Sequence, residues 1–268
     1  MRKVTSARTY APPSNGSIFY RGPSLLDGRP IVAIVTGLRR RSANTKTGNE
    51  LQTWILRSDV DPLTAIQTGE DYSICGDCAL RGIQGVGREC YVTIVQAPNA
   101  VYKAFKRRRY GKLDLSRVAG RIVRIGSYGD PAAVPADIWR TLLSASGTGW
   151  TGYTHQWQTC DRSLRSILMA SVDTLHERDS AIAAGWRTFR VRTDVSPLDP
   201  RLEISCPASA EMGHRVTCAD CTLCQGQANK ARSIAILPHG AGAGGIIARD
   251  TLKAAIQGGT PITLSAIA

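Results

Sequence analysis

The sequence lacks several features that would place a protein in a special class. No stretch approaches the roughly 18 consecutive apolar residues that a membrane-spanning helix requires, so no membrane association is expected. Arg2 and Lys3 near the start are followed by no apolar segment, which argues against a secretory signal. The chain also shows no internal repeat of clear period and no long low-complexity segment. With 268 residues, 43% of them hydrophobic, we expect a cytoplasmic protein with a sizeable core.

Acidic residues are scarce relative to basic ones: 34 Lys and Arg stand against 21 Asp and Glu, giving a formal net charge of +13. Such an excess favours association with polyanions such as nucleic acid, and it is equally typical of a basic, soluble surface. The densest basic segment, KAFKRRRYGK, interleaves cations with aromatic residues, which suits a phosphate backbone with stacked bases. A solvated helix face is the alternative. The candidate nucleic-acid contacts are Lys106, Arg107, Arg108 and Arg109.

Short apolar runs separated by polar and glycine-rich segments predict alternating strands and helices. We expect an extended N-terminal arm over residues 1–29 and a single α/β domain over residues 30–268. The alternation indicates a parallel sheet in a partial or complete TIM-barrel-like arrangement. Thr174 and Glu177 predict a capping box. Strands are predicted over 31–35, 51–56, 91–95, 121–126, 151–157, 167–171, 188–192 and 233–237, and helices over 97–110, 135–146 and 174–185.

Four of the eight cysteines form one set, in which Cys206 is followed after eleven residues by the C-x2-C-x2-C run of Cys218, Cys221 and Cys224. In a reducing cytoplasm, clustered thiols are more typical of metal ligands or redox groups than of disulfides. Two residues between cysteines let successive thiolates turn onto one centre, and three close cysteines with a remote fourth are typical of iron–sulfur ligation. We therefore predict a 4Fe–4S cluster here. A four-cysteine zinc site is the alternative.

A second group, Cys75, Cys78 and Cys90, has C-x2-C-x11-C spacing and lacks an evident fourth ligand. It predicts a second 4Fe–4S cluster with one open iron that could bind a substrate or a cofactor. A closed site completed by Cys160, His155 or a carboxylate remains the alternative, and Cys160 could equally be a small buried residue. An open position is what separates catalytic from structural metal. The domain therefore carries two cysteine-rich inserts, 75–90 and 206–224.

Polar side chains follow several predicted strands, at the end where barrel enzymes carry their active sites. Asp130, His155, Trp157 and Asp173 are accordingly candidates for a ligand pocket. Period two within the 151–157 strand places Tyr153, His155 and Trp157 on one face, as a wall suited to stacking a base or an adenine. A turn at Asp130, a structural His155 and a helix cap at Asp173 are the alternatives.

Several stretches carry a resemblance to a known family. They are SICGDCALRG with CYV, RIGSYGDPAAVP, TGYTHQW, LMASVD, GWRTFRV, and CPASAEMG with TCADCTLC. Over roughly residues 30 to 240 the chain resembles an uncharacterised family of phage-encoded cysteine-rich proteins. This resemblance implies a bacteriophage iron–sulfur protein that resides in the cytoplasm of the infected host cell.

A more distant similarity is to the radical S-adenosylmethionine enzymes, which pair a three-cysteine cluster with a partial α/β barrel and a glycine-rich turn after an early strand. RIGSYGDP has the placement of that turn. The usual C-x3-C-x2-C of that family is replaced here by C-x2-C-x11-C. The similarity implies S-adenosylmethionine as a cofactor.

Two functions are consistent with these features. The first is a redox or radical-type iron–sulfur enzyme, which would draw electrons from a host redox partner. The second is a nucleic-acid-binding protein whose zinc or iron–sulfur sites are structural. A phage accessory protein that binds a host factor is a third option, which no residue pattern singles out.

Overall fold

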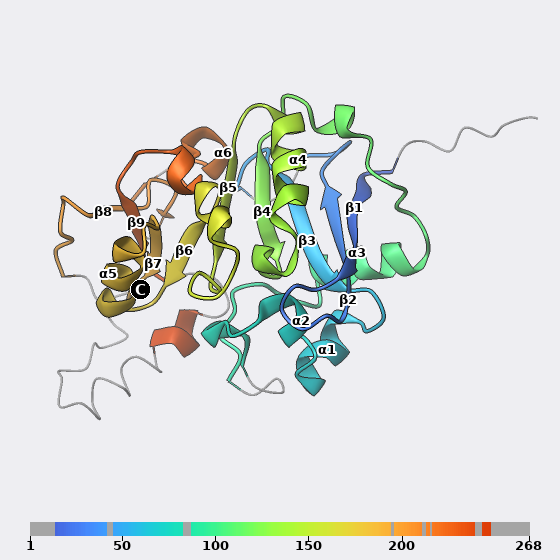
Figure 1. Cartoon of the computed structure of the whole chain (residues 1–268), viewed down its shortest axis with the longest axis horizontal. Helices are drawn as coiled ribbons and strands as arrows, with labels where there is room; N and C mark the ends of the chain where they lie inside the picture. Colours follow the sequence, from blue (N-terminus) through green and yellow to red (C-terminus); the bar gives the residue numbers. More distant parts are fainter. Residues whose placement is uncertain are drawn as a thin grey trace, which may run out of the picture.

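The computed structural model describes residues 14–41, 45–82, 87–193, 196–210, 213–214, 216–238 and 243–247. These residues form a nine-stranded sheet in the order β1-β2-β3-β4-β5-β6-β7-β9-β8 (Figure 1). The pairs β1–β2 and β2–β3 are antiparallel, and every pair from β3 to β8 is parallel. The strands are β1 (Gly16–Pro23), β2 (Pro30–Thr36), β3 (Leu51–Arg57), β4 (Val123–Tyr128), β5 (Trp150–Thr154), β6 (Met169–Val172), β7 (Thr188–Val191), β8 (Glu203–Ser205) and β9 (Ser233–Ile236).

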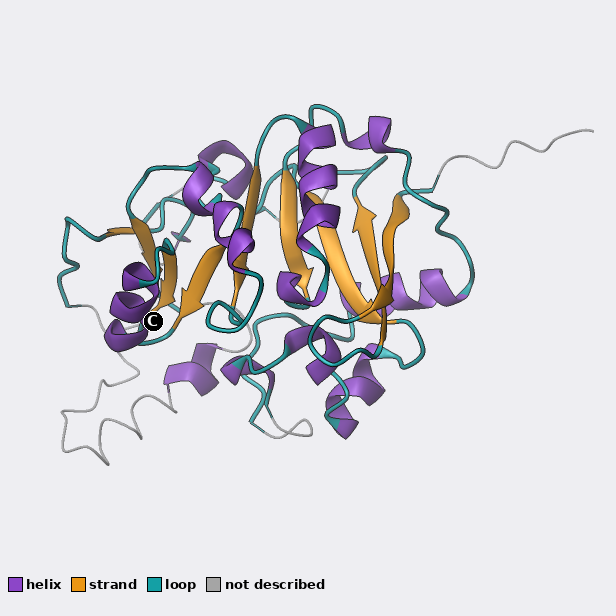
Figure 2. Cartoon of the chain, viewed as in Figure 1, coloured by secondary structure: helices purple, strands orange, loops and turns teal. Residues whose placement is uncertain are grey.

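The parallel strands β3 to β7 follow one another in chain order, whereas β9 lies between β7 and β8. Helices lie in several of the connections. Helices α4 and α5 both lie on the face of the sheet that is turned to the viewer in Figure 2. The α/β class is therefore confirmed. A complete barrel is wrong, because β1 and β8 are the two edges of an open sheet. The helices are α1 (Pro62–Thr68), α2 (Tyr72–Cys75), α3 (Ala97–Lys106), α4 (Ala136–Ser146), α5 (Leu175–Ala183) and α6 (Cys218–Cys221).

The core centres on β2 and β3, which are buried along most of their length. Ile31, Ile34, Leu51 and Ile55 are fully buried. A strand covered on both faces has no solvent side, so its sequence tends to be a continuous apolar run rather than an alternation. This explains why 31–35 predicted a strand correctly, whereas 51–56 did so although it includes the buried polar residues Gln52 and Thr53. Trp139 of α4 is fully buried and joins this core.

Most of the other predicted elements are confirmed with small shifts, and the capping box of Thr174 and Glu177 opens α5. The strand predicted over 91–95 is wrong: no strand forms there, and α3 begins at Ala97. Tyr91 and Val95 are exposed, so the β-branched run has no sheet to pack on. Helix α3 also ends at Lys106, so Arg107–Arg109 follow the helix instead of extending it.

The N-terminal arm expected over residues 1–29 needs correction, because β1 lies inside it. Residues 16–23 pair with β2 along their whole length and belong to the sheet. Residues 1–13 lie outside the described residues. In the described part of the chain, no helix combines the length and the apolar character needed to cross a membrane.

Candidate metal and ligand site

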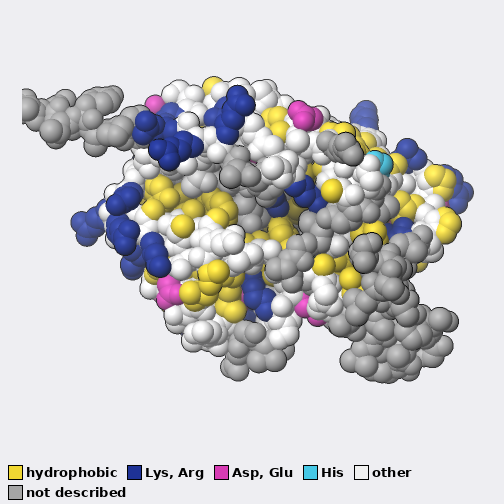
Figure 3. Space-filling view, turned by 180° about the vertical axis from the view of Figure 1, so that it is seen from behind, with side chains coloured by type: hydrophobic (Ala, Val, Ile, Leu, Met, Phe, Trp, Pro, Cys, Tyr) yellow, Lys and Arg dark blue, Asp and Glu magenta, His cyan; other side chains and the backbone are white. Residues whose placement is uncertain are grey.

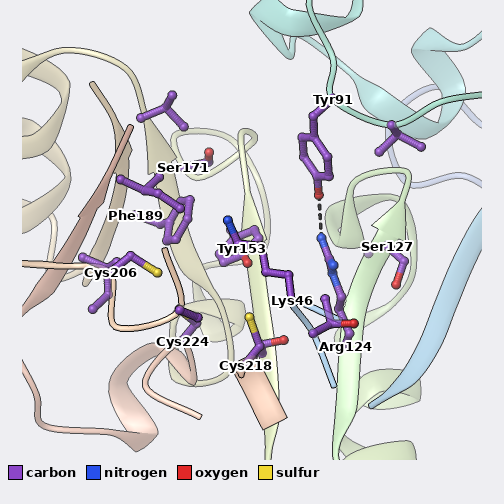
Figure 4. Close-up of a pocket in the computed structure, with 18 of the residues that line it drawn as sticks. Lys46, Tyr91, Arg124, Ser127, Tyr153, Ser171, Phe189, Cys206, Cys218 and Cys224 are labelled. Carbon is purple, nitrogen blue, oxygen red and sulfur yellow. Dashed lines mark hydrogen bonds between the residues drawn. The ribbon is translucent and has the colours of Figure 1, made fainter. Parts of the chain in front are cut away.

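Side chains on the inner side of the parallel strands enclose a cavity of about 370 Å³. The cavity is lined by residues of β4, β5, β6, β7 and β9, among them Arg124, Tyr153, Ser171 and Phe189 (Figure 4). All seven cysteines that were predicted as metal ligands line it, whereas Cys160 does not. Two cysteine groups far apart in the sequence thus face one space. They are Cys75, Cys78 and Cys90 (the upstream trio) and Cys206, Cys218, Cys221 and Cys224 (the downstream quartet).

The upstream trio lies where β3, β4 and β5 end, because α2 and the segments after it follow β3 and fold under the sheet (Figure 1). The backbone of this segment is bonded to the ends of those strands. Gln156 Nε2 donates to the Cys75 carbonyl at 3.2 Å, and the Asp130 N–H donates to the Ile74 carbonyl. Gly76 has a φ of +54° and lies against the Gln156 side chain, where a Cβ would be only 2.5 Å away. Any other residue at position 76 would separate the trio from β5.

An ion pair closes the loop between Cys78 and Cys90. Buried Asp71 accepts from the Arg81 guanidinium at 2.9 Å, and Arg88 lies 3.8 Å from its second oxygen. The Cys90 N–H donates to the carbonyl of Leu80, which returns the chain to the start of the loop. Burial, and then Cys78, Asp71 and Cys90, raise the pKa of the Cys75 thiol well above its ordinary value. The three cysteines are therefore close enough to influence one another, and the thiolate form requires a neighbouring cation.

Two further polar groups at this end have unused hydrogen-bonding capacity. The Tyr128 hydroxyl and the His155 Nε2 atom are buried, and neither has a hydrogen-bond partner among the described residues. Both side chains line the cavity. Burial lowers the pKa of His155, but Cys78 and the carboxylates of Asp130 and Asp173 outweigh it and raise that pKa to about 9. His155 therefore lies beside Cys78 of the trio, and its raised pKa favours the protonated ring, which must lose a proton before either nitrogen binds a metal. Cys160 lies outside the cavity.

The downstream quartet approaches the same cavity from the other end of the strands, where α6 lies (Figure 1). The Cys218 and Ala219 N–H groups donate to the carbonyls of Lys46 and Thr47, which precede β3. The Cys224 carbonyl accepts from the N–H of Gly152 within β5 at 3.0 Å. Backbone hydrogen bonds to two strands therefore fix the segment that carries three of the four cysteines.

Arg187 closes this end from the adjoining β7 strand. Its Nη1 atom donates to the carbonyls of Leu223 and Gly226 at 2.8 and 2.9 Å. Burial, and then Cys206, Cys218 and Cys221, raise the pKa of the Cys224 thiol well above its ordinary value. The quartet that the spacing predicted thus comes together as one group in space.

Of the four residues that the sequence predicted to form a ligand pocket, two line the cavity and two do not. Asp130 and His155 line it, while Asp173 and Trp157 do not. Strand β5 ends at Thr154, because the Asp130 carboxylate accepts from the His155 N–H at 2.8 Å and the Thr154 hydroxyl accepts from the Gln156 N–H at 2.9 Å. These bonds replace the sheet ladder, so the predicted period two is lost. Placing Trp157 on the His155 face was therefore wrong, and Trp157 is buried in the main core.

The donor atoms at the cavity are of the types that bind transition metals. Thiol sulfurs lie at both ends of the cavity, and one imidazole nitrogen, that of His155, lies beside the upstream trio. All eight cysteines are free of disulfides. Within the described residues, however, no three His, Cys, Asp or Glu side chains converge closely enough to hold a single metal ion. The cysteine groups are therefore assembled more loosely than the ligand set of one bound ion.

Sequence reasoning missed several residues of the cavity. Arg124 and Tyr91 were not predicted as site residues, although Arg124 Nη2 donates to the Tyr91 hydroxyl at 2.7 Å inside the cavity (Figure 4). Glu50, fully buried, accepts from Thr151 with one oxygen and leaves the other without a partner. A charged residue inside the apolar strand RIVRIG was the available signal for Arg124, because an arginine there must face a cavity or an anion.

The basic segment lies apart from this cavity, at the end of α3. Lys103, Lys106 and Arg107–Arg109 are exposed, and Figure 3 shows basic side chains gathered along the corresponding edge of the molecule. Tyr102 and Phe105 are buried, and Lys106 lies over the Tyr102 ring, 5.7 Å from its centre. These two rings are therefore not exposed for stacking on a base, and contact of the exposed cations with nucleic acid stays a prediction.

Comparison with known proteins adds no relative to this description: no family model, no curated protein and no solved structure matches the chain.

Proposed function

We propose that the protein is an iron–sulfur enzyme of the redox or radical type. In this proposal the downstream quartet holds one 4Fe–4S cluster and the upstream trio holds a second. The observation that carries it is the meeting of both cysteine groups at one cavity, from opposite ends of the same strands. Cysteines kept only for packing have no reason to share a cavity wall.

The spacing of the cysteines favours a cluster over zinc in this proposal, because three close cysteines with a remote fourth are typical of iron–sulfur ligation. A structural zinc site with four cysteines more often has two separated pairs. When bound, iron–sulfur clusters supply electrons one at a time.

In this proposal each of these residues has a separate task. Cys75, Cys78 and Cys90 supply three ligands, and the fourth position is either taken by the Nε2 atom of His155 or left open for a substrate. Asp130 supports the backbone of His155 by accepting its N–H at 2.8 Å.

The sequential order of the parallel strands supports a partial TIM-barrel-like arrangement, as in the radical S-adenosylmethionine enzymes. The trio follows the first parallel strand and RIGSYGDP covers β4 and its turn, which are the relative positions that the similarity requires. We therefore include S-adenosylmethionine as a candidate ligand of the trio. The proposal also includes a bacteriophage origin, a cytoplasmic location in the infected cell and a host redox partner as the source of electrons.

Anaerobic purification, followed by iron and sulfide analysis, tests the proposal. Two clusters predict about eight iron and eight sulfide ions per chain, and electron paramagnetic resonance spectra that change when dithionite is added. A trio with an open iron should also change its spectrum when S-adenosylmethionine is added. Colourless protein holding stoichiometric zinc would refute the proposal.

Variants assign the iron to the two groups. Replacing Cys75, Cys78 and Cys90 with Ser should remove about half of the iron, and so should replacing Cys218, Cys221 and Cys224. The matched control is Cys160→Ser, which alters a cysteine outside the cavity and should leave the iron content unchanged. Loss of iron in the Cys160 variant would instead make Cys160 the missing ligand.

A second candidate function is nucleic-acid binding, with the metal centres structural. The observation that favours it is the group of exposed cations at the end of α3. In the described residues these cations form no ion pair, although Asp61 lines the same shallow pocket as Lys103 and Lys106. Cations that neutralise phosphates make binding fall steeply with salt concentration.

Replacing Arg107, Arg108 and Arg109 with Ala tests this second candidate. Affinity for single- or double-stranded DNA and RNA should fall. The number of phosphate contacts, which is inferred from the slope of log affinity against log salt concentration, should decrease by roughly two to three. The matched control removes three scattered exposed arginines, Arg29, Arg40 and Arg162. An equal loss in the control, or no binding by the unaltered protein, would count against a defined interface.

A further inference from the structure

Arg124 is the feature of the cavity that the proposed clusters do not explain. It projects from β4 into the cavity that both cysteine groups line (Figure 4). Its side chain is half-buried, yet its guanidinium makes only one hydrogen bond with the described residues, to the Tyr91 hydroxyl at 2.7 Å. A guanidinium has five N–H donors, so four are left for another partner.

The described part of the protein compensates this charge only from a distance. Glu50 interacts electrostatically with Arg124, but no carboxylate lies within ion-pair distance of Arg124 in the described residues, and the Glu50 carboxylate accepts from Thr151. Asp130, the one carboxylate among the described lining residues, is already bonded to Thr154, Ala132 and His155. The open donors of the guanidinium can therefore pair with the oxyanion of a bound molecule.

The surroundings of Arg124 are aromatic rather than acidic. Its guanidinium lies 5.9 Å from the centre of the Tyr91 ring, and Tyr153 stacks on Phe189 with ring centres 4.3 Å apart. Lys46 reaches into the same space from the segment before β3 (Figure 4). Cations beside flat apolar walls suit a molecule with an anionic group and a planar or apolar body.

We propose that the cavity binds a small molecule carrying a carboxylate or phosphate, and that Arg124 anchors this anionic group. Guanidinium pairs with either oxyanion through two parallel hydrogen bonds, so both classes share the anchor. The cavity of about 370 Å³ admits a small molecule and excludes a polymer. This ligand site is independent of whether the cysteines hold iron.

Binding of three simple probes tests the inference on the protein as purified, with its metal content measured in the same preparation. The probes are inorganic phosphate, benzoate and benzamide, the last being a neutral counterpart of benzoate of the same shape. Calorimetry should detect phosphate, benzoate or both, and benzamide should bind at least tenfold more weakly than benzoate. Binding of phosphate alone assigns a phosphate ester as the ligand class, and binding of benzoate alone assigns a carboxylate. Equal binding of benzoate and benzamide, or no binding of either anion, overturns the inference.

Variants connect the binding to Arg124. Arg124→Gln should weaken the anion at least tenfold, and Arg124→Lys should weaken it less, because lysine keeps the charge but loses the paired donors. The matched control is Arg162→Gln, which removes an exposed arginine outside the cavity and should leave binding unchanged. Unaltered binding in Arg124→Gln overturns the inference.

A measurement on the unaltered protein covers the case in which the Arg124 variants do not fold. Phenylglyoxal modifies accessible arginines, and mass spectrometry of the peptide that contains Arg124 reports its modification. The bound anion should slow this modification at least tenfold while leaving the Arg162 peptide unaffected. An absence of protection by a probe that binds overturns the assignment to Arg124. Anion binding by metal-free protein would support this inference while refuting the proposed clusters.

Discussion

The two cysteine groups face the same cavity but are held in place by different means. The upstream trio belongs to a segment with its own packing: Ile74, Leu80 and Asp71 are 1%, 6% and 1% exposed. In the downstream quartet, α6 carries Cys218 and Cys221 and buries none of its residues. The trio is thus held by a small core and an ion pair. Helix α6 has no buried residue and is held by backbone hydrogen bonds and by the packing of half-buried Cys218 on a small apolar cluster.

This difference indicates which centre the fold can do without. A segment that packs by itself keeps its shape when a metal leaves, as a site that exchanges ligands requires. A segment without buried side chains needs its metal in order to stay folded, as in small zinc domains. The quartet is therefore expected to be the structural centre and the trio the chemical one.

The largest expected effect follows from removing one centre at a time. Cys218→Ser with Cys221→Ser should lower the melting temperature by roughly 10 °C and make residues 216–228 sensitive to proteases. Cys75→Ser with Cys78→Ser should lower it by less than half as much, because Ile74 and Leu80 stay packed. Differential scanning calorimetry and limited proteolysis measure both. A larger loss in the trio variant would reverse the proposed division of roles.

Carboxylates beside each group provide a second comparison. Glu203, fully buried at the start of β8, accepts from Arg190 and Arg178 at 2.7 and 3.1 Å. Glu203→Gln removes the negative charge that these two mostly buried guanidinium groups share, while Arg178 keeps its ion pair with Asp179, so the free energy of unfolding should fall by about 3 kcal/mol. Asp71→Asn at the trio should cost only about 1 to 2 kcal/mol, since Arg81 keeps an acceptor. Urea denaturation measures both, and equal losses would contradict the comparison.

The pH dependence of stability distinguishes the two ends of the cavity, because Glu50 lies near Cys218 in the quartet. Burial raises the pKa of Glu50 from 4.5 to about 7, although Arg124 and the bond from Thr151 oppose the shift. The folded state thus favours the protonated carboxyl, and this contribution is complete below pH 4.5 and lost as the pH rises through 7. The free energy of unfolding should decrease by on the order of 2 to 3 kcal/mol over this interval.

Glu50→Gln provides the control, because an amide stays neutral at every pH. The decrease in stability between pH 4.5 and 7 should become shallower by that amount in denaturation curves recorded across the interval. An unchanged slope would mean that Glu50 is ionised in the folded protein.

The smallest expected effect concerns a helix cap at the quartet. The Thr217 hydroxyl accepts from the Asp220 N–H at the start of α6, and the Thr174 hydroxyl accepts from the Glu177 N–H at the start of α5. Thr217→Ala and Thr174→Ala should each cost about 1 kcal/mol. The Thr217 variant should in addition release iron from the quartet faster when a chelator is added. Equal release rates would show that α6 does not depend on its cap.

The sequence predicts a structural element of this protein correctly where the residues of that element alone determine its conformation. The strand at 31–35 was predictable because burial on both faces leaves a continuous apolar run. The 91–95 segment has the same composition, yet Tyr91 and Val92 face the cavity and no strand pairs with them. Strand propensity is a weak guide without a neighbouring strand.

In the candidate site, too, local sequence signals predicted some features, while others depend on residues far apart in the chain. Cysteine spacing predicted the composition of both groups, because close cysteines on one turn of chain are neighbours in any fold. That the groups share a cavity depends on the order of the strands, which no spacing encodes. The end of β5 at Thr154 was hidden as well, since it depends on the Asp130 carboxylate from a distant strand.

Strand β5 also acts as a ruler. The downstream quartet is attached to it at Gly152 through the Cys224 carbonyl, and the upstream trio at Gln156 through the Cys75 carbonyl. Only Tyr153, Thr154 and His155 separate these attachment points, and β5 keeps its place in the sheet as far as Thr154. The backbone therefore fixes the attachment of the quartet, whereas the attachment of the trio depends on the side chain of Gln156. The separation of the two ends, which an electron or a ligand held by Arg124 would cross, is thus set by a short piece of backbone and one side chain.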